Sequence, residues 1–218
     1  MTPSIGSDPT TLIGFLGALA LLPLAFIVGT SFLKFSIVLM VVRNAIGVQQ
    51  VPPQMALYAL ALVLTGFVMA PVGYQMADIA TAENLNAVSS REKIEAARRI
   101  LDPWKQYLVR NTNEDALQTF IGIAKAHWPT DVARDATNEN LLIVLPSFTI
   151  SELKRAFEIG FLLYIPFIVI DVVVSNILLA LGMQMVAPMT FSTPLKLLLF
   201  VSVDGWTRLL TALSAGAG

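Results

Sequence analysis

The chain has 218 residues, of which 56% are hydrophobic and 13% charged, and its mean hydropathy is +0.72. This composition exceeds what a soluble domain needs for its core and is typical of membrane proteins. A net charge of -1 without a basic stripe argues against a nucleic-acid partner, and the lack of cysteine excludes disulfides, thiolate metal sites and cysteine nucleophiles. With a single histidine, His127, the sequence predicts neither a metal site nor a cofactor.

Two long apolar runs open the chain. The first extends over residues 12–42 and the second over 55–76, and each exceeds the about 20 residues that cross a bilayer as a helix. Gly47 and a proline pair lie between them, where they are expected to end one helix and start the next. Residues 1–77 are therefore predicted to form an N-terminal helical hairpin.

Basic residues predict how this hairpin is oriented. Lys34 and Arg43 flank the far end of the first run with no acid nearby, which places the 43–54 connection in the cytoplasm. Four crossings then put both termini and residues 78–145 outside the cytoplasm. No Lys or Arg precedes Lys34 and the first run is too long for a signal peptide, so the start is predicted to be retained.

The middle of the chain, residues 78–145, holds most of the charges and is predicted to form a polar helical segment outside the membrane. Residues 91–110 are rich in helix formers, with a break or kink expected at Pro103. A second, amphipathic helix is predicted over 113–128. Residues 129–141 are polar and without periodicity, which is typical of a linker.

The last part of the chain, residues 146–218, repeats the plan of two apolar runs. Thr149, with Glu152 three residues later, predicts a helix start through a capping box, and Pro166 is expected to kink that helix. The connection at 180–194 contains three methionines, two prolines and no charge. The chain is thus predicted to be all-α, with two apolar helical hairpins of four membrane-type helices flanking a polar segment.

Charged residues inside apolar runs are costly in lipid and are therefore candidate functional residues. When the second hairpin is folded about residue 188, Asp171 lies 17 residues before the turn and Asp204 lies 16 after it, at the same level. Two level carboxylates need a cation or a shared proton, and Arg208, one helical turn beyond Asp204, is the candidate to neutralise them. This buried polar cluster is predicted either to fix the helix register or to couple proton movement.

The same folding leaves Lys196 level with Ala180 and without a partner in its own hairpin. Glu152 reaches Lys196 only from a neighbouring subunit or through a bent hairpin. A salt bridge between Glu152 and Lys196 of different subunits is therefore predicted to support assembly.

The residues alone leave two function classes open. A small ion or solute transporter with midplane aspartates is built from hairpins of this kind, and a structural membrane scaffold is the alternative. Enzyme activity is not expected, because neither aspartate lies in the Gly-x-Gly-Asp setting of intramembrane aspartyl proteases. His127 lies in the polar segment beside Trp128, as a surface or packing histidine.

Four stretches carry information beyond periodicity. They are TSFLKFSIVLMVVRNAIGVQQVPP (30–53), PSFTISELKRAFEIGF (146–161), PFIVIDVVVSNILLALGM (166–183) and STPLKLLLFVSVDGW (192–206). Together they resemble the signature blocks of the FliP/SctR family, the core export-apparatus membrane proteins of type III secretion systems. The retained start and the first hairpin are more similar to the injectisome branch than to the flagellar branch, whereas the polar segment resembles nothing specific.

This resemblance implies a pore-forming subunit of the type III export gate that conducts unfolded proteins across the bacterial inner membrane. Family members form a helically staggered pentamer with S-type and T-type membrane proteins, and work with the export switch and export gate proteins of the same system. Much of their apolar surface is buried between subunits instead of facing membrane lipid. The polar segment and both termini are then expected in the periplasm.

The resemblance also implies a role for the neutral connection. In the family a run of methionines follows the LLALG stretch and seals the lumen, and Met183 and Met185 match that run. Methionine is flexible and polarizable, which suits a gasket that must fit any passing chain. Gln184 and Val186 interrupt the run and Met189 falls beyond it, so Val186 and Met189 are candidates for an additional constriction.

Overall fold

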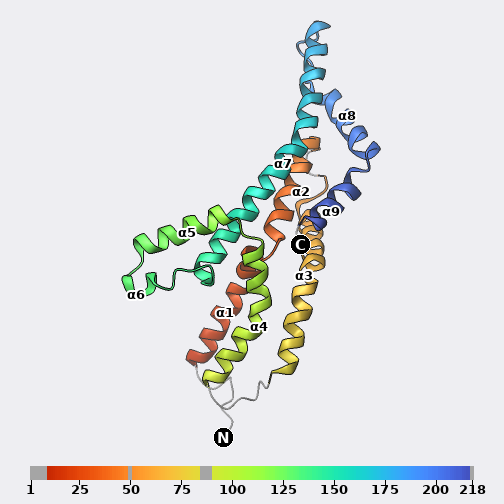
Figure 1. Ribbon diagram of the computed structural model, residues 1–218. Helices are drawn as coiled ribbons and strands as arrows, with labels where there is room; N and C mark the ends of the chain where they lie inside the picture. The colour runs from red at the N-terminus through yellow and green to blue at the C-terminus, as the bar shows by residue number, and fades with distance from the viewer. Residues whose placement is uncertain (1–8, 49–50, 84–89, 217–218) are drawn as a thin grey trace.

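The computed structural model describes residues 9–48, 51–83 and 90–216, and the regular elements in these ranges are all helices (Figure 1). The prediction of an all-α chain is therefore confirmed. In chain order the helices are α1 (Pro9–Val28), α2 (Phe32–Ile46), α3 (Gln54–Ala82), α4 (Ser90–Arg110), α5 (Glu114–His127), α6 (Thr130–Ala133), α7 (Leu141–Ala180), α8 (Met189–Ser202) and α9 (Gly205–Ala215).

Each hairpin contains a run that is broken into two helices. Residues 29–31 separate α1 from α2, and the end of α1 is bent by 63° from α2. In the second hairpin α8 and α9 are bent by 61° at Asp204, whose φ of 51° is left-handed. Hydropathy continues across both bends, so the apolar runs do not reveal that a Gly or Asp-Gly step ends the helix at these two places.

The polar segment folds largely as expected. Helix α5 starts at the N-cap Asn113, whose side chain accepts a hydrogen bond from the Asp115 amide at 2.8 Å. Helix α4 continues through Pro103, so of the break or kink predicted there the break does not occur. The linker after α5 also contains the short helix α6.

Helix α7 is 40 residues long and starts earlier than the capping box predicts. Asn140 is its N-cap and accepts a hydrogen bond from the Leu142 amide at 3.0 Å. Thr149 lies inside the helix, where its hydroxyl donates to the Leu145 carbonyl at 2.8 Å, so the prediction of Thr149 as N-cap is wrong. Pro166 does fall inside α7, as expected.

Two hydrophobic cores meet along α7. The larger core is formed by α2, α3 and α7 together with Phe200, Leu209 and Leu213 from the α8–α9 pair. The smaller core joins α4 and α5 to the first turns of α7, with Met69 and Val72 of α3 packed against it. Helix α7 therefore carries both cores, and Figure 1 shows α5 and α6 extending to one side of it.

The helices α3 and α7 are each long and apolar enough to cross a membrane. The bent pairs α1–α2 and α8–α9 raise the number of membrane-capable units to as many as four if each pair counts as one span. Large apolar side chains such as Phe67 of α3, with 71% of its surface exposed, stay uncovered by the chain itself. Such surfaces need lipid or another subunit to cover them.

Candidate functional site

The methionine connection lies at the outer end of the α7–α8 hairpin (Figure 1). Gly182 has a φ of 75° and ends α7 in a Schellman motif, in which the Met183 amide donates to the Leu178 carbonyl at 2.9 Å. Met185 is 100% exposed and Met183 39% exposed, and Met189 at the start of α8 is also exposed. Val186 is half-buried. The turn therefore presents its methionines outward from the rest of the chain.

Asp171 of α7 pairs with Lys196 of α8 below this turn. The Lys196 Nζ lies 2.5 Å from the Asp171 Oδ2, and the lysine side chain is buried. The Nζ also lies near Gly47, because a Cβ added to Gly47 would be 3.8 Å from it. Gly47 is the C-cap of α2, where the helix dipole favours a cation. Lys196 thus holds α8 against both α7 and the end of α2.

The predicted cluster of Asp171, Asp204 and Arg208 does not form within the chain. Asp204 and Arg208 are exposed, and neither joins the ion pair that Asp171 makes with Lys196. The level of Asp204 was counted along a straight helix turning at residue 188, but the bend at Asp204 redirects α9. The turn lies between the end of α7 at Ala180 and the start of α8 at Met189, which is earlier than the residue 188 assumed from the sequence. With this earlier turn, Asp171 is level with Lys196, the residue for which the sequence predicted no partner in its own hairpin.

Glu152 of α7 also has partners in its own chain. Its Oε2 lies 3.2 Å from the Lys34 Nζ and its Oε1 lies 3.2 Å from the Arg155 Nη1. The side chains of Lys34 and Glu152 are 3% and 1% exposed. Within the chain the structure therefore pairs Glu152 with Lys34 and not with Lys196. Sequence reasoning missed this pair because its members are far apart in sequence, although a lysine within an apolar run signals that a partner is needed.

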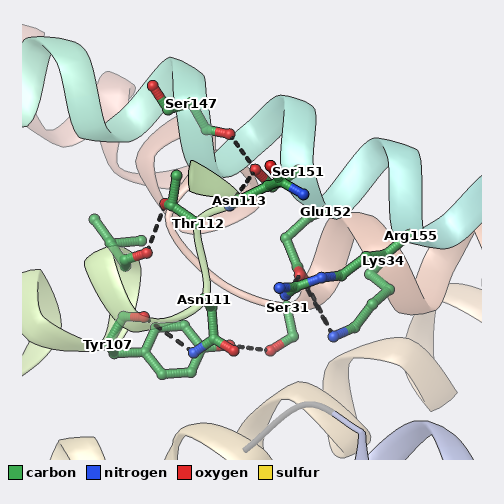
Figure 2. Close-up of polar contacts among 11 residues, drawn as sticks. Ser31, Lys34, Tyr107, Asn111, Thr112, Asn113, Ser147, Ser151, Glu152 and Arg155 are labelled. Atoms are coloured by element: carbon green, nitrogen blue, oxygen red, sulfur yellow. Dashed lines mark hydrogen bonds and ion pairs between the residues drawn. The ribbon is translucent and has the colours of Figure 1, made fainter. Parts of the chain in front are cut away.

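Polar contacts continue from this pair to the polar segment, as Figure 2 shows. The Ser31 hydroxyl at the start of α2 shares a hydrogen bond of 2.5 Å with the Tyr107 hydroxyl of α4. The Asn113 amide donates to the Ser151 Oγ of α7 at 2.9 Å. These bonds fix α4 and α5 to the helices that hold the buried ion pair.

Side chains of α4 and α7 lie against the break between α1 and α2. The indole nitrogen of Trp104 donates to the Gly29 carbonyl at 2.7 Å, and the Thr149 hydroxyl lies 3.4 Å from the Val28 carbonyl. A broken helix leaves carbonyls without intrahelical partners, and the Trp104 indole satisfies that of Gly29. Trp104 of α4 therefore stabilises the bend, with the Thr149 hydroxyl of α7 beside it.

Tyr107 provides a prediction about pH. Burial raises the pKa of its phenol above the ordinary value of 10.0, and the hydrogen bond with Ser31 opposes the rise. The folded chain therefore holds the phenolic proton more tightly than the unfolded chain does, so the stability that Tyr107 contributes is complete below pH 10 and is lost as the pH rises through the raised pKa.

The free energy of unfolding of the full-length chain in detergent should consequently fall as the pH rises above about 10. The decline should be shallower in Tyr107→Phe, because phenylalanine has no proton to lose. Tyr74→Phe is the matched control, since Tyr74 is 75% exposed on α3. Equal slopes for wild type and Tyr107→Phe would contradict the prediction.

The described residues contain no group of three or more His, Asp or Glu side chains that could hold a metal ion. His127 is exposed at the last position of α5.

Comparisons with known proteins match this chain along most of its length. The model of the FliP family matches residues 15–213. The chain is 51% identical over 214 residues to harpin secretion protein HrcR of Erwinia amylovora, covering 94% of this chain and 95% of that protein. It is 48% identical over 206 residues to Yop proteins translocation protein R of Yersinia pestis, covering 93% of each. It is 44% identical over 214 residues to virulence protein YscR of Salmonella typhimurium, covering 96% and 97%.

Proposed function

Because the chain belongs to the FliP family and its relatives are type III secretion proteins, we propose that it is a pore-forming subunit of the export gate. In this role it conducts unfolded proteins across the bacterial inner membrane, and its methionine turn seals the lumen when no substrate passes. The general role in type III secretion follows from the family. The conduit and the seal are the finer parts of the proposal.

The exposed methionine turn carries this proposal. Met185 is 100% exposed although it is apolar, and it stands at the end of a hairpin whose long helix contains 40 residues. A single exposed methionine has little effect, but several copies around an axis form a deformable apolar ring. Such a ring can close on itself and still adapt to side chains of any kind. Charges in the same place would bind some substrates and let ions through.

The ring requires several copies of the chain. We propose the assembly of the family, a pentamer joined by the S-type and T-type membrane proteins, with the export switch and export gate proteins as further partners. The exposed apolar residues on α3 and α7, such as Phe67 and Phe161, provide surface for these contacts. In this arrangement the polar segment and both termini face the periplasm, and the connection between α2 and α3 faces the cytoplasm.

The seal is tested by replacing both Met183 and Met185 with alanine in the assembled complex. Alanine removes most of the side-chain volume from the ring, so ion conductance through the complex in planar bilayers should rise several-fold in the absence of substrate. Met55→Ala is the matched control, because Met55 is 77% exposed at the start of α3, away from the turn. If the double variant conducts no more than the control, the turn is not the seal.

A further inference from the structure

An apolar groove opens between α7 and the bent α8–α9 pair. Its volume is about 610 Å³, and Val42 of α2 also contributes to its wall. Leu163 and Phe167 line it from α7, and Leu209 and Ala212 line it from α9. Figure 1 shows α8 diverging from α7 before α9 returns toward α2 and α3. The groove therefore follows directly from the bend.

Aromatic packing holds the bend between α8 and α9, so that the α8–α9 pair does not close onto α7. Phe200 contacts Phe167 with ring centroids 6.3 Å apart and Trp206 with centroids 5.2 Å apart in an edge-on arrangement. Gly205 fits against the same ring, because a Cβ at this position would overlap Phe200. The aromatic cluster thus fixes α9 at an angle to α8 and keeps the groove open.

Arg208 is the only charged residue among the described side chains that line the groove. It is exposed and makes no ion pair or side-chain hydrogen bond with the described residues. Asp204 lies one turn earlier, but the two side chains do not pair. A free guanidinium beside an apolar groove suits a ligand with an anionic head and an apolar tail.

We propose that the groove binds an anionic phospholipid, with one acyl chain among Leu163, Phe167 and Leu209 and the lipid phosphate on the guanidinium of Arg208. The groove size favours an acyl chain over a helix of another subunit. A helix with its side chains is about 10–12 Å wide, so a volume of this size holds only about one turn of it. A flexible acyl chain fits a narrow groove without such a limit.

The preference for an anionic head group is tested with the full-length chain in detergent. It is titrated with phosphatidylglycerol and, separately, with phosphatidylcholine of the same acyl chains. Native mass spectrometry counts the lipid molecules bound. Wild type should bind phosphatidylglycerol more tightly. Arg208→Gln should weaken this binding by about tenfold, as expected for the loss of one charge-assisted contact, whereas Arg208→Lys should retain most of it. Asp204→Asn should strengthen it, because a repelling carboxylate is removed.

The binding of the acyl chain in the groove is tested by Ala212→Phe, which fills the groove from the exposed face of α9. This variant should weaken the binding of both lipids equally, whereas Arg208→Gln should weaken mainly the binding of phosphatidylglycerol. Circular dichroism confirms that each variant keeps its helices. Equal binding of the two lipids by wild type, or unchanged phosphatidylglycerol binding by Arg208→Gln, would overturn the proposal.

A second copy of the chain is the competing occupant. Because the chain has no cysteine, Ala212→Cys can be labelled with maleimide-benzophenone in the assembled complex and then irradiated. An adduct with the mass of a phospholipid supports the lipid site. A covalent dimer of the chain as the main product would overturn it.

Discussion

Replacing Glu152 with glutamine should lower the free energy of unfolding by about 3–5 kcal/mol, the cost of leaving a buried charge without its partner. The variant keeps the shape of the side chain but leaves Lys34, which is 3% exposed, without a carboxylate. Denaturant unfolding of the full-length chain in detergent, followed by circular dichroism, measures this loss.

A matched control separates burial from charge. Glu158 also pairs with a lysine, Lys154, but both side chains are 60% exposed, so Glu158→Gln should change stability by less than about 1 kcal/mol. The double variant Lys34→Met, Glu152→Leu should recover most of the loss, because apolar side chains replace both charges. If Glu152→Gln and Glu158→Gln have the same effect, the buried pair does not stabilise the fold as we infer.

Gly29→Ala should destabilise the chain by about 1–3 kcal/mol through overpacking at the break between α1 and α2. A Cβ at this position would lie 2.7 Å from both the Ala25 carbonyl oxygen and the Trp104 ring. To relieve these contacts the indole must move, and its hydrogen bond of 2.7 Å to the Gly29 carbonyl would be lost. Thermal unfolding in detergent should therefore begin at a lower temperature.

Gly66→Ala and Gly73→Ala on α3 are the controls for Gly29→Ala, and they should not destabilise the chain. An added Cβ meets nothing within 4 Å at either position, so alanine should leave stability unchanged or raise it by up to about 1 kcal/mol through helix propensity. A loss of stability in these controls as large as that in Gly29→Ala would show that the effect is not specific to the break.

The helices were predictable because apolar periodicity and caps are local signals. The apolar runs became the α1–α2 pair, α3, α7 and the α8–α9 pair, and the predicted 113–128 helix is α5. The start of α7 was missed because Thr149 and Glu152 resemble a capping box, while the N-cap Asn140 lies in a stretch that reads as a linker. The two bends were missed because hydropathy continues across them.

The pairing of charges was the least predictable part of the site. Counting residues from the turn assumed straight helices and a turn at residue 188. An error of a few residues in the position of the turn was enough to predict Asp204 and Arg208 beside Asp171, where the structure has Lys196. The pair of Lys34 and Glu152 depends on how α2 packs against α7. No local sequence pattern predicts that packing. The methionine turn was easier to locate, because the connection is neutral and rich in methionine and follows the LLALG stretch that resembles the family, and the structure places it directly after α7, where Gly182 has a φ of 75°.

The length of α7 has a further consequence for how the protein meets the bilayer. With a rise of about 1.5 Å per residue, a helix of 40 residues is about 60 Å long, twice the roughly 30 Å of hydrocarbon in a membrane. Even tilted by about 40°, it would extend over about 46 Å along the membrane normal. Part of this apolar rod must therefore be shielded from water by protein instead of lipid, and its first turns already are, beneath α4 and α5.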